Sequence, residues 1–172
     1  MALTRDLTRS LTRDLTHDLD GVGTSRYFTA LASASSQYYT FPTVTFTGDF
    51  SIPFEIQTTA TPAGDFIAAH PTLTATDHIN MPSGGGGVLE FQIDAATTIT
   101  GSVVVNDGKL HKGLLTRVGT TGSLYIDGVL DNSGTVTTGD SVWGLIGTPS
   151  TLASANMWDG IIANVGMDDA GS

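Results

Sequence analysis

Alternation of hydrophobic and polar residues is the main pattern in most of the chain. Within residues 49–57 every second position is Phe or Ile, from Phe50 to Ile56, and residues 89–93 repeat the pattern with Leu, Phe and Ile. A period of two places the apolar side chains on one face of a β-strand. Both stretches therefore predict strands with one buried face.

Two further features modify this picture. Pro53 lies inside the first alternating run and has no backbone N–H, so we expect that strand at the edge of a sheet or beside a bulge. The run Val103–Val105 predicts a short buried strand, and Asn106-Asp107-Gly108 predicts the turn after it.

The clearest hairpin lies in the middle of the chain. We predict strands over residues 110–118 and 123–127, joined by the four-residue loop Gly119–Gly122 and followed by a turn at Asp127-Gly128. Ser83–Gly87 predicts a flexible loop. Short strands separated by frequent turn signals indicate an all-β sandwich or barrel.

The N-terminal segment follows a different pattern, with leucine at every fourth position. These residues are Leu3, Leu7, Leu11, Leu15 and Leu19. This spacing puts the leucines on one face of an extended chain, or on a drifting stripe of a helix, and both conformations stay open. Because leucines left in water would forgo burial, we expect this arm to oligomerise or to anchor in a partner, the alternative being a disordered tail.

Glycines after the arm mark a boundary. Asp20-Gly21-Val22-Gly23 predicts a hinge, since Gly confers flexibility. We therefore divide the chain into an arm with its hinge, residues 1–23, and a β-sandwich, residues 24–172.

The net charge restricts the classes of binding partner that we expect. The 172 residues carry a formal net charge of −10, and the charges of residues 1–19 cancel, so residues 20–172 hold the whole excess. Nucleic-acid binding needs a basic surface, and no long apolar run predicts a membrane span. We expect neither nucleic acid nor membrane as a partner. The chain has no cysteine, which removes disulfides and thiolate metal sites.

Four segments of the sandwich occur in an order that resembles the concanavalin-A-like lectin/glucanase superfamily in its laminin-G-like form. They are Thr47–Ile52, Asn106–His111 (with Leu110 where Trp is usual), Ser123–Val129, and Leu145–Gly147 followed by Trp158–Val165. The resemblance implies an all-β fold, an antiparallel jelly-roll sandwich preceded by the N-terminal arm.

The same resemblance bears on catalysis. Glucanases of this superfamily use a strand of the type Glu-x-Asp-x-x-Glu, and here Glu55 and Glu90 are the only glutamates and neither lies in that pattern. We therefore assign no catalytic residue and expect a protein that is not an enzyme. A glycoside hydrolase of the same superfamily stays the third alternative.

Aromatic residues are the candidate glycan contacts, because aromatic faces stack on the apolar faces of sugars. We select Tyr38, Tyr39 and Trp143, and we expect Trp158 to lie in the core. Residues 77–80, with Asp, His and Asn, form the alternative of a calcium site, although we assign no metal and no cofactor. For His111 and Asp127 we expect packing and turn formation rather than chemistry.

Leu-Thr-Arg repeats ahead of a laminin-G-like domain resemble phage and prophage structural proteins. This resemblance implies a subunit of a virion fibre, spike or decoration, located in the virion, homo-oligomeric with a trimer favoured, and attached to other virion proteins through the arm. The sandwich would then project and bind cell-surface glycans. A free carbohydrate-binding lectin module is the main alternative, and head or tail attachment stays open.

Overall fold

The computed structural model of the protein describes residues 28–30, 38–60, 64–68, 77–93, 98–147 and 158–169. The five leucines of the arm and the glycine hinge lie outside these residues, so the arm and the domain boundary stay predictions. Within the described ranges the chain forms only strands and turns, and no helix there could cross a membrane.

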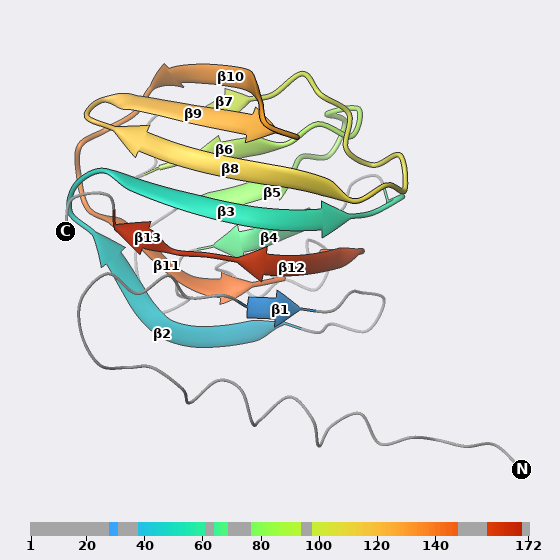
Figure 1. Cartoon of the computed structure of the whole chain (residues 1–172), viewed down its shortest axis with the longest axis horizontal. Helices are drawn as coiled ribbons and strands as arrows, with labels where there is room; N and C mark the ends of the chain where they lie inside the picture. The colour runs from blue at the N-terminus through green and yellow to red at the C-terminus, as the bar shows by residue number, and fades with distance from the viewer. Residues whose placement is uncertain are drawn as a thin grey trace, which may run out of the picture.

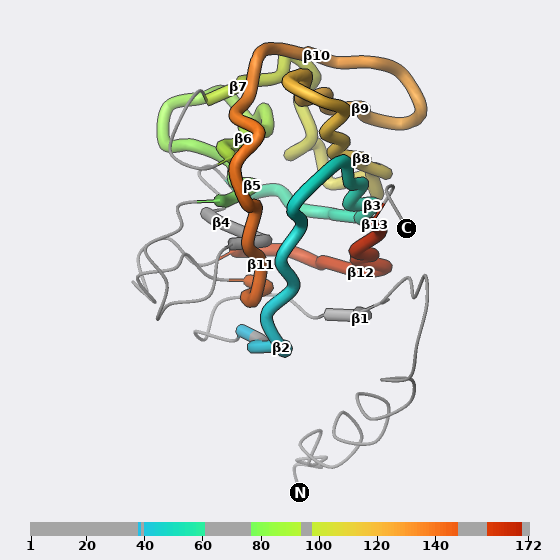
Figure 2. Tube along the Cα trace, turned by 90° about the vertical axis from the view of Figure 1, so that its left-hand side faces the viewer, coloured from blue at the N-terminus to red at the C-terminus, as the bar shows by residue number. Residues whose placement is uncertain are grey.

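The strands form two sheets packed face to face, drawn from the front in Figure 1 and from the side in Figure 2. The front sheet has the order β1 (Phe28–Ala30), β12 (Ile161–Val165), β3 (Phe50–Gln57), β8 (His111–Val118), β9 (Thr121–Ile126) and β10 (Val129–Thr135), with β13 (Asp168–Asp169) also paired to β3. The back sheet has the order β2 (Tyr39–Phe46), β11 (Ser141–Ile146), β4 (Gly64–Ala68), β5 (His78–Met81), β6 (Glu90–Gln92) and β7 (Thr98–Thr100). All pairs are antiparallel, and the chain passes between the sheets several times, which confirms the predicted jelly-roll sandwich.

The core lies between the sheets and follows the predicted alternation. Phe50, Ile52, Phe54 and Ile56 of β3 are each at most 1% exposed, and residues 89, 91 and 93 beside β6 are fully buried. The Phe50 ring stacks on that of Phe46 with centroids 4.7 Å apart. Burial of one face of each strand is thus what holds the two layers together.

Pro53 is not at a sheet edge, which corrects the first of the two predicted placements. Its strand β3 lies between β8 and the pair β12 and β13. The carbonyl of Pro53 accepts a hydrogen bond from Gly166 N at 2.9 Å, in the segment that separates β12 from β13. The N atom and C=O of a strand residue point the same way, so the missing donor of Pro53 faces this break in the ladder rather than a continuous strand.

Two local predictions are also wrong. Residues 118 and 121 pair directly, so Gly119 and Thr120 form a two-residue turn, tighter than the predicted loop. Gly119 has a φ of +56°, the left-handed conformation such a turn requires. Val103 and Val104 are 37% and 49% exposed and lie outside any strand, because Val103 N donates to Asp131 Oδ1 instead of to a ladder partner.

A buried cation closes one end of the sandwich. Arg117 on β8 is 1% exposed, and its guanidinium donates to the carbonyls of Gly48 and Phe46 and, at 2.6 Å, to that of Gly139. Its Cζ lies 4.9 Å from the centroid of the Phe50 ring. Arg117 therefore joins the β2–β3 turn to the segment before β11 and compensates its own desolvation.

We predict that Arg117→Met lowers the free energy of unfolding by roughly 2–4 kcal/mol, because the three carbonyls around the buried guanidinium lose a charged donor that Met cannot replace. Lys112→Met, on the same strand but with a side chain 73% exposed, is the matched control and should change stability by less than about 0.5 kcal/mol. Urea unfolding measures both. Equal stability of the two variants would contradict the structural role of Arg117.

Candidate functional site

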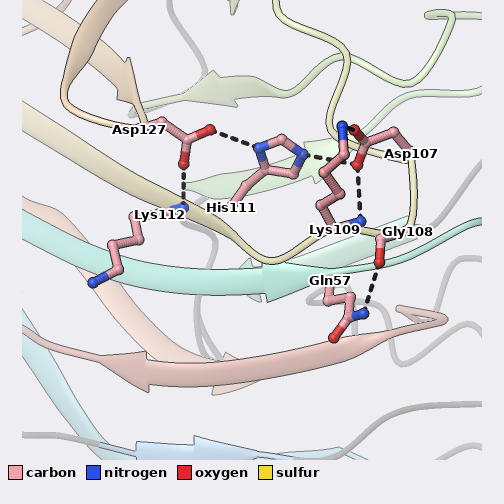
Figure 3. Close-up of polar contacts among 7 residues, drawn as sticks. All are labelled: Gln57, Asp107, Gly108, Lys109, His111, Lys112 and Asp127. Carbon is pink, nitrogen blue, oxygen red and sulfur yellow. Dashed lines mark hydrogen bonds and ion pairs between the residues drawn. The ribbon is translucent and has the colours of Figure 1, made fainter.

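A histidine held between two aspartates lies at the start of β8 (Figure 3). The His111 side chain is only 10% exposed. Its Nδ1 lies 2.8 Å from Asp127 Oδ2, and its Nε2 lies 3.1 Å from Asp107 Oδ1. We call these three residues the histidine clamp.

Backbone conformation explains why Asp127 reaches the histidine. Asp127 and Gly128 have φ values of 52° and 83°, which makes the predicted two-residue turn between β9 and β10 and confirms that interpretation. In this turn Asp127 Oδ1 also accepts the backbone N–H of Lys112 at 2.9 Å. The carboxylate therefore fastens the turn to β8.

The turn after Val105 presents the second carboxylate. Asp107 accepts hydrogen bonds from Lys109 N at 2.8 Å and from Lys109 Nζ at 2.7 Å. Gln57 Nε2 donates to the carbonyl of Gly108 at 2.7 Å, which ties this turn to the end of β3. The clamp thus joins the Asp107 turn, β8 and the β9–β10 turn, and the Gln57–Gly108 hydrogen bond adds the end of β3 (Figure 3).

The three groups shift each other's proton affinity. Burial disfavours the charged ring, but the hydrogen bonds to Asp127 and Asp107 outweigh it, so the pKa of His111 is raised. The hydrogen bonds from Lys109 and His111 hold the pKa of Asp107 far below its ordinary value. The backbone N–H of Lys112, followed by His111, lowers the pKa of Asp127.

This arrangement suits a structural clamp better than catalysis or metal binding. The two ring nitrogens of His111 point to different carboxylates, and no group of three or more His, Asp or Glu side chains able to hold a metal occurs among the described residues. The calcium alternative placed Asp77 and Asn80 in one loop. Instead residues 78–81 form β5, Asp77 is buried and accepts a hydrogen bond from Val142 N, and Asn80 alternates to the half-buried outer face.

A second feature is a hollow of about 330 Å³ on the outer face of the front sheet. Its lining residues are Pro53, Phe54, Glu55, Lys112, Gly113 and Asn164. Asn164 Nδ2 donates to Glu55 Oε2 at 2.8 Å, and Lys112 Nζ lies 3.5 Å from Glu55 Oε1. Neighbouring strands β12, β3 and β8 thus supply an amide, a carboxylate and an ammonium group to one surface.

The side chain of Asn164 reaches this surface because its backbone departs from the strand conformation. Its φ of 50° is left-handed, a conformation that Asn adopts more readily than most residues. Ile162 and Ala163 pair with Ile56 and Glu55, so regular alternation would have turned Asn164 inward. Asn164 lies two positions before Gly166, whose N–H donates to the carbonyl of Pro53.

The aromatic candidates chosen from the sequence do not come together. Trp143 is fully buried, its Nε1 donates to Ser141 Oγ, and a ring without exposed surface cannot stack on a sugar, so it is removed from the glycan contacts. Tyr38 is 40% exposed before β2 in the back sheet, away from the hollow in the front sheet. The side chain of Tyr39 lies outside the described residues. Trp158 is 3% exposed, which confirms its core position.

Comparison with known proteins identifies the family. Residues 33–168 match the Laminin G family model described as the concanavalin A-like lectin/glucanases superfamily, so the chain belongs to this superfamily. No curated protein matches the sequence.

Three solved structures have the same fold. The LG1-3 region of the laminin alpha2 chain is 16% identical with a TM-score of 0.64, and the match covers 86% of this chain and 29% of that one. Domains LG4-5 of the mouse laminin alpha1 chain are 18% identical with a TM-score of 0.56 over 70% of this chain and 37% of that one. Domain 4 of AbnA, an extracellular arabinanase from Geobacillus stearothermophilus, is 16% identical with a TM-score of 0.61, over 86% of this chain and 76% of that one. The chain therefore spans about a third of each laminin fragment.

We predict that the clamp stabilises the fold most between about pH 4 and pH 6.5. Since folding raises the pKa of His111, its contribution is complete below the unfolded value of about 6.5 and is lost as pH rises through the raised folded value. Since folding lowers the pKa values of both aspartates, their contribution is present above about 3.9 and is lost as pH falls through the lowered folded values.

The test compares wild type with His111→Asn in urea unfolding across this pH range. The stability difference should be largest near pH 5.5 and shrink toward pH 8.5, about two units above the ordinary histidine pKa. His78→Asn is the matched control, because the half-buried His78 lies on the back sheet. A difference independent of pH would show that the ion pairing is unimportant.

Proposed function

We propose that this domain binds carbohydrate without cleaving it, and that the hollow on the outer face of the front sheet is the binding site. The observation that carries the proposal is the Asn164–Glu55–Lys112 group at the hollow. Glu55 offers carboxylate oxygens and Lys112 offers ammonium protons to the hydroxyls of a sugar. The side-chain carbonyl oxygen of Asn164 accepts no hydrogen bond within the described residues and can accept one from a sugar. Pro53 beside them supplies an apolar surface for its C–H groups.

A structural neighbour supports this proposal. Domain 4 of the arabinanase was solved in complex with arabinotriose, so a sandwich of this shape accommodates a sugar chain in that protein. Only the class of ligand is taken from the arabinanase domain, because a sequence identity of 16% is evidence for a common fold alone. The positions of the contacts come from the hollow of the present chain.

A binding role without hydrolysis agrees with the positions of the two glutamates. Glycoside hydrolysis needs two carboxyl groups about 5–9 Å apart across the scissile bond. Glu55 and Glu90, the only glutamates, project from the outer faces of different sheets and cannot form such a pair. Glu55 is instead engaged by an amide and an ammonium group.

We also propose, from the leucine repeats, that the sandwich is attached to a larger particle. Arms with leucine at every fourth position would bury these side chains against sister arms or a groove of another virion protein. A homotrimeric fibre, spike or decoration subunit of a phage virion is the assembly that the repeats favour. The free lectin module remains the alternative for a chain whose arm does not assemble.

We predict that the full chain binds glycans on an array and that Glu55→Ala weakens this binding at least about tenfold, a loss of about 1.4 kcal/mol. Glu90→Ala is the matched control, since Glu90 is a half-buried glutamate on the opposite sheet. It should bind as wild type does. Absence of binding to every glycan would refute the proposal, and sugar release lost in Glu55→Ala would replace it with the hydrolase alternative.

For the arm, we predict that deleting residues 1–20 converts the oligomer into monomers, while the circular dichroism spectrum of the sandwich is kept. The reason is that the leucines, rather than the acidic sandwich, supply the apolar contact area. Light scattering coupled to size-exclusion chromatography measures the mass. A truncated protein that assembles as the full chain does would refute the anchoring role.

A further inference from the structure

An apolar row crosses the outer face of the front sheet from β3 to β10. Pro53 lies opposite Leu114, Leu114 opposite Tyr125, and Tyr125 opposite Leu130. Residues paired in this way project to the same face of a sheet. Leu130 is 50% exposed and the other three are half-buried, so the row is open to solvent. The strands that carry it lie side by side in Figure 1.

Hydroxyl groups border one side of this apolar row. Ser51, Thr116 and Ser123 lie two positions from the apolar row along β3, β8 and β9, and Ser133 lies three positions from Leu130 along β10 because the register shifts between Leu130 and Asn132. The register pairs of this hydroxyl row are 51 with 116, 116 with 123 and 123 with 133. None of the four hydroxyls hydrogen-bonds to another residue in the part of the chain that the structure describes. They are thus available as donors and acceptors for a ligand.

The Asn164–Glu55–Lys112 group borders the other side. Glu55 lies opposite Lys112, two positions beyond Pro53 and Leu114. The outer face therefore offers a band of apolar surface, including one aromatic ring, between two rows of polar groups. A sugar chain has this same alternation, because its C–H faces are apolar and its edges carry hydroxyls.

The length of the apolar row and the charges on this face restrict the size and charge of the ligand. Neighbouring strands are about 4.8 Å apart, so a row over four strands is about 14 Å long, more than one sugar ring and near the length of a trisaccharide. The charges on this face do not favour an acidic sugar, since Lys112 pairs with Glu55 and Asp168 lies opposite Ser51. The net charge of −10 adds to this repulsion.

We infer that the ligand is a linear, uncharged oligosaccharide of about three sugars that crosses β3, β8, β9 and β10, with Tyr125 as the residue on which a sugar stacks. This inference rests on the proposed function and specifies its ligand class and its direction across the sheet. The stacking residue is therefore neither Trp143 nor Tyr38.

The experiment uses the full chain on an array of arabino-, xylo-, malto- and cello-oligosaccharides in graded lengths from one sugar upward, with sialylated and uronic-acid glycans beside them. We expect affinity for one uncharged series to rise by about tenfold or more from the single sugar to the trisaccharide and then to level off. Tyr125→Ala should lower the trisaccharide affinity about tenfold, and the control Tyr38→Ala should leave it unchanged.

Leu130→Ser provides a variant without a folding risk, because Leu130 is half exposed on a strand at the sheet edge. It should weaken trisaccharide binding about threefold, as it removes part of the apolar row. Thermal unfolding of all variants confirms that they are folded.

The outcomes distinguish failure of the proposed function from failure of the inference about the ligand. If no glycan binds, the proposed function and this inference both fail. If glycans bind but acidic ones are preferred, or affinity is independent of length, or the Tyr125 and Leu130 variants bind like wild type, this inference is overturned while the proposed function stands.

Discussion

The pairing register of the middle strands of the front sheet is the constraint on which the rest of the structure depends. Ile52, Leu115 and Leu124 lie opposite one another in β3, β8 and β9, and all three are fully buried. A slip by one residue would turn this inner row to solvent, so burial fixes the register. The same register then decides which side chains form rows on the outer face. The core of the sandwich and its proposed binding surface are two sides of one set of strand pairs.

Strand β8 is held at both ends, which keeps that register rigid. At its start, His111 is clamped between Asp107 and Asp127, and near its end the Arg117 guanidinium is bound by backbone carbonyls. Between these points Lys112, Leu114 and Thr116 project outward. Glycine completes the packing at Gly113, where a Cβ would lie 2.0 Å from the Phe54 ring. Polar contacts at the two ends of β8 thus hold in place the strand that carries the middle of the proposed binding surface.

The sequence predicts the positions of individual strands better than it predicts which strands pair with each other. Period-two alternation located β3 and the buried positions around β6, because a single strand carries that signal. Pro53 was misplaced, since the break between β12 and β13 that accepts it lies more than a hundred positions away. The sequence did not point to the residues of the proposed site, Glu55, Asn164 and Tyr125, for the same reason. Only pairing reveals their common face, and residue type alone does not specify the left-handed φ of Asn164. Trp143 was misassigned because residue type alone does not distinguish a core ring from an exposed one.

The most direct test of the account is an amide and methyl NMR titration of the full chain with an uncharged trisaccharide that it binds on the array. The account predicts that shift changes concentrate on the outward residues of β3, β8, β9 and β10, including Leu114, Tyr125 and Leu130. It also predicts little change at the loop end of the sandwich, which holds the turn of Asp107 and Gly108. Changes confined to that loop end or to the back sheet would contradict it.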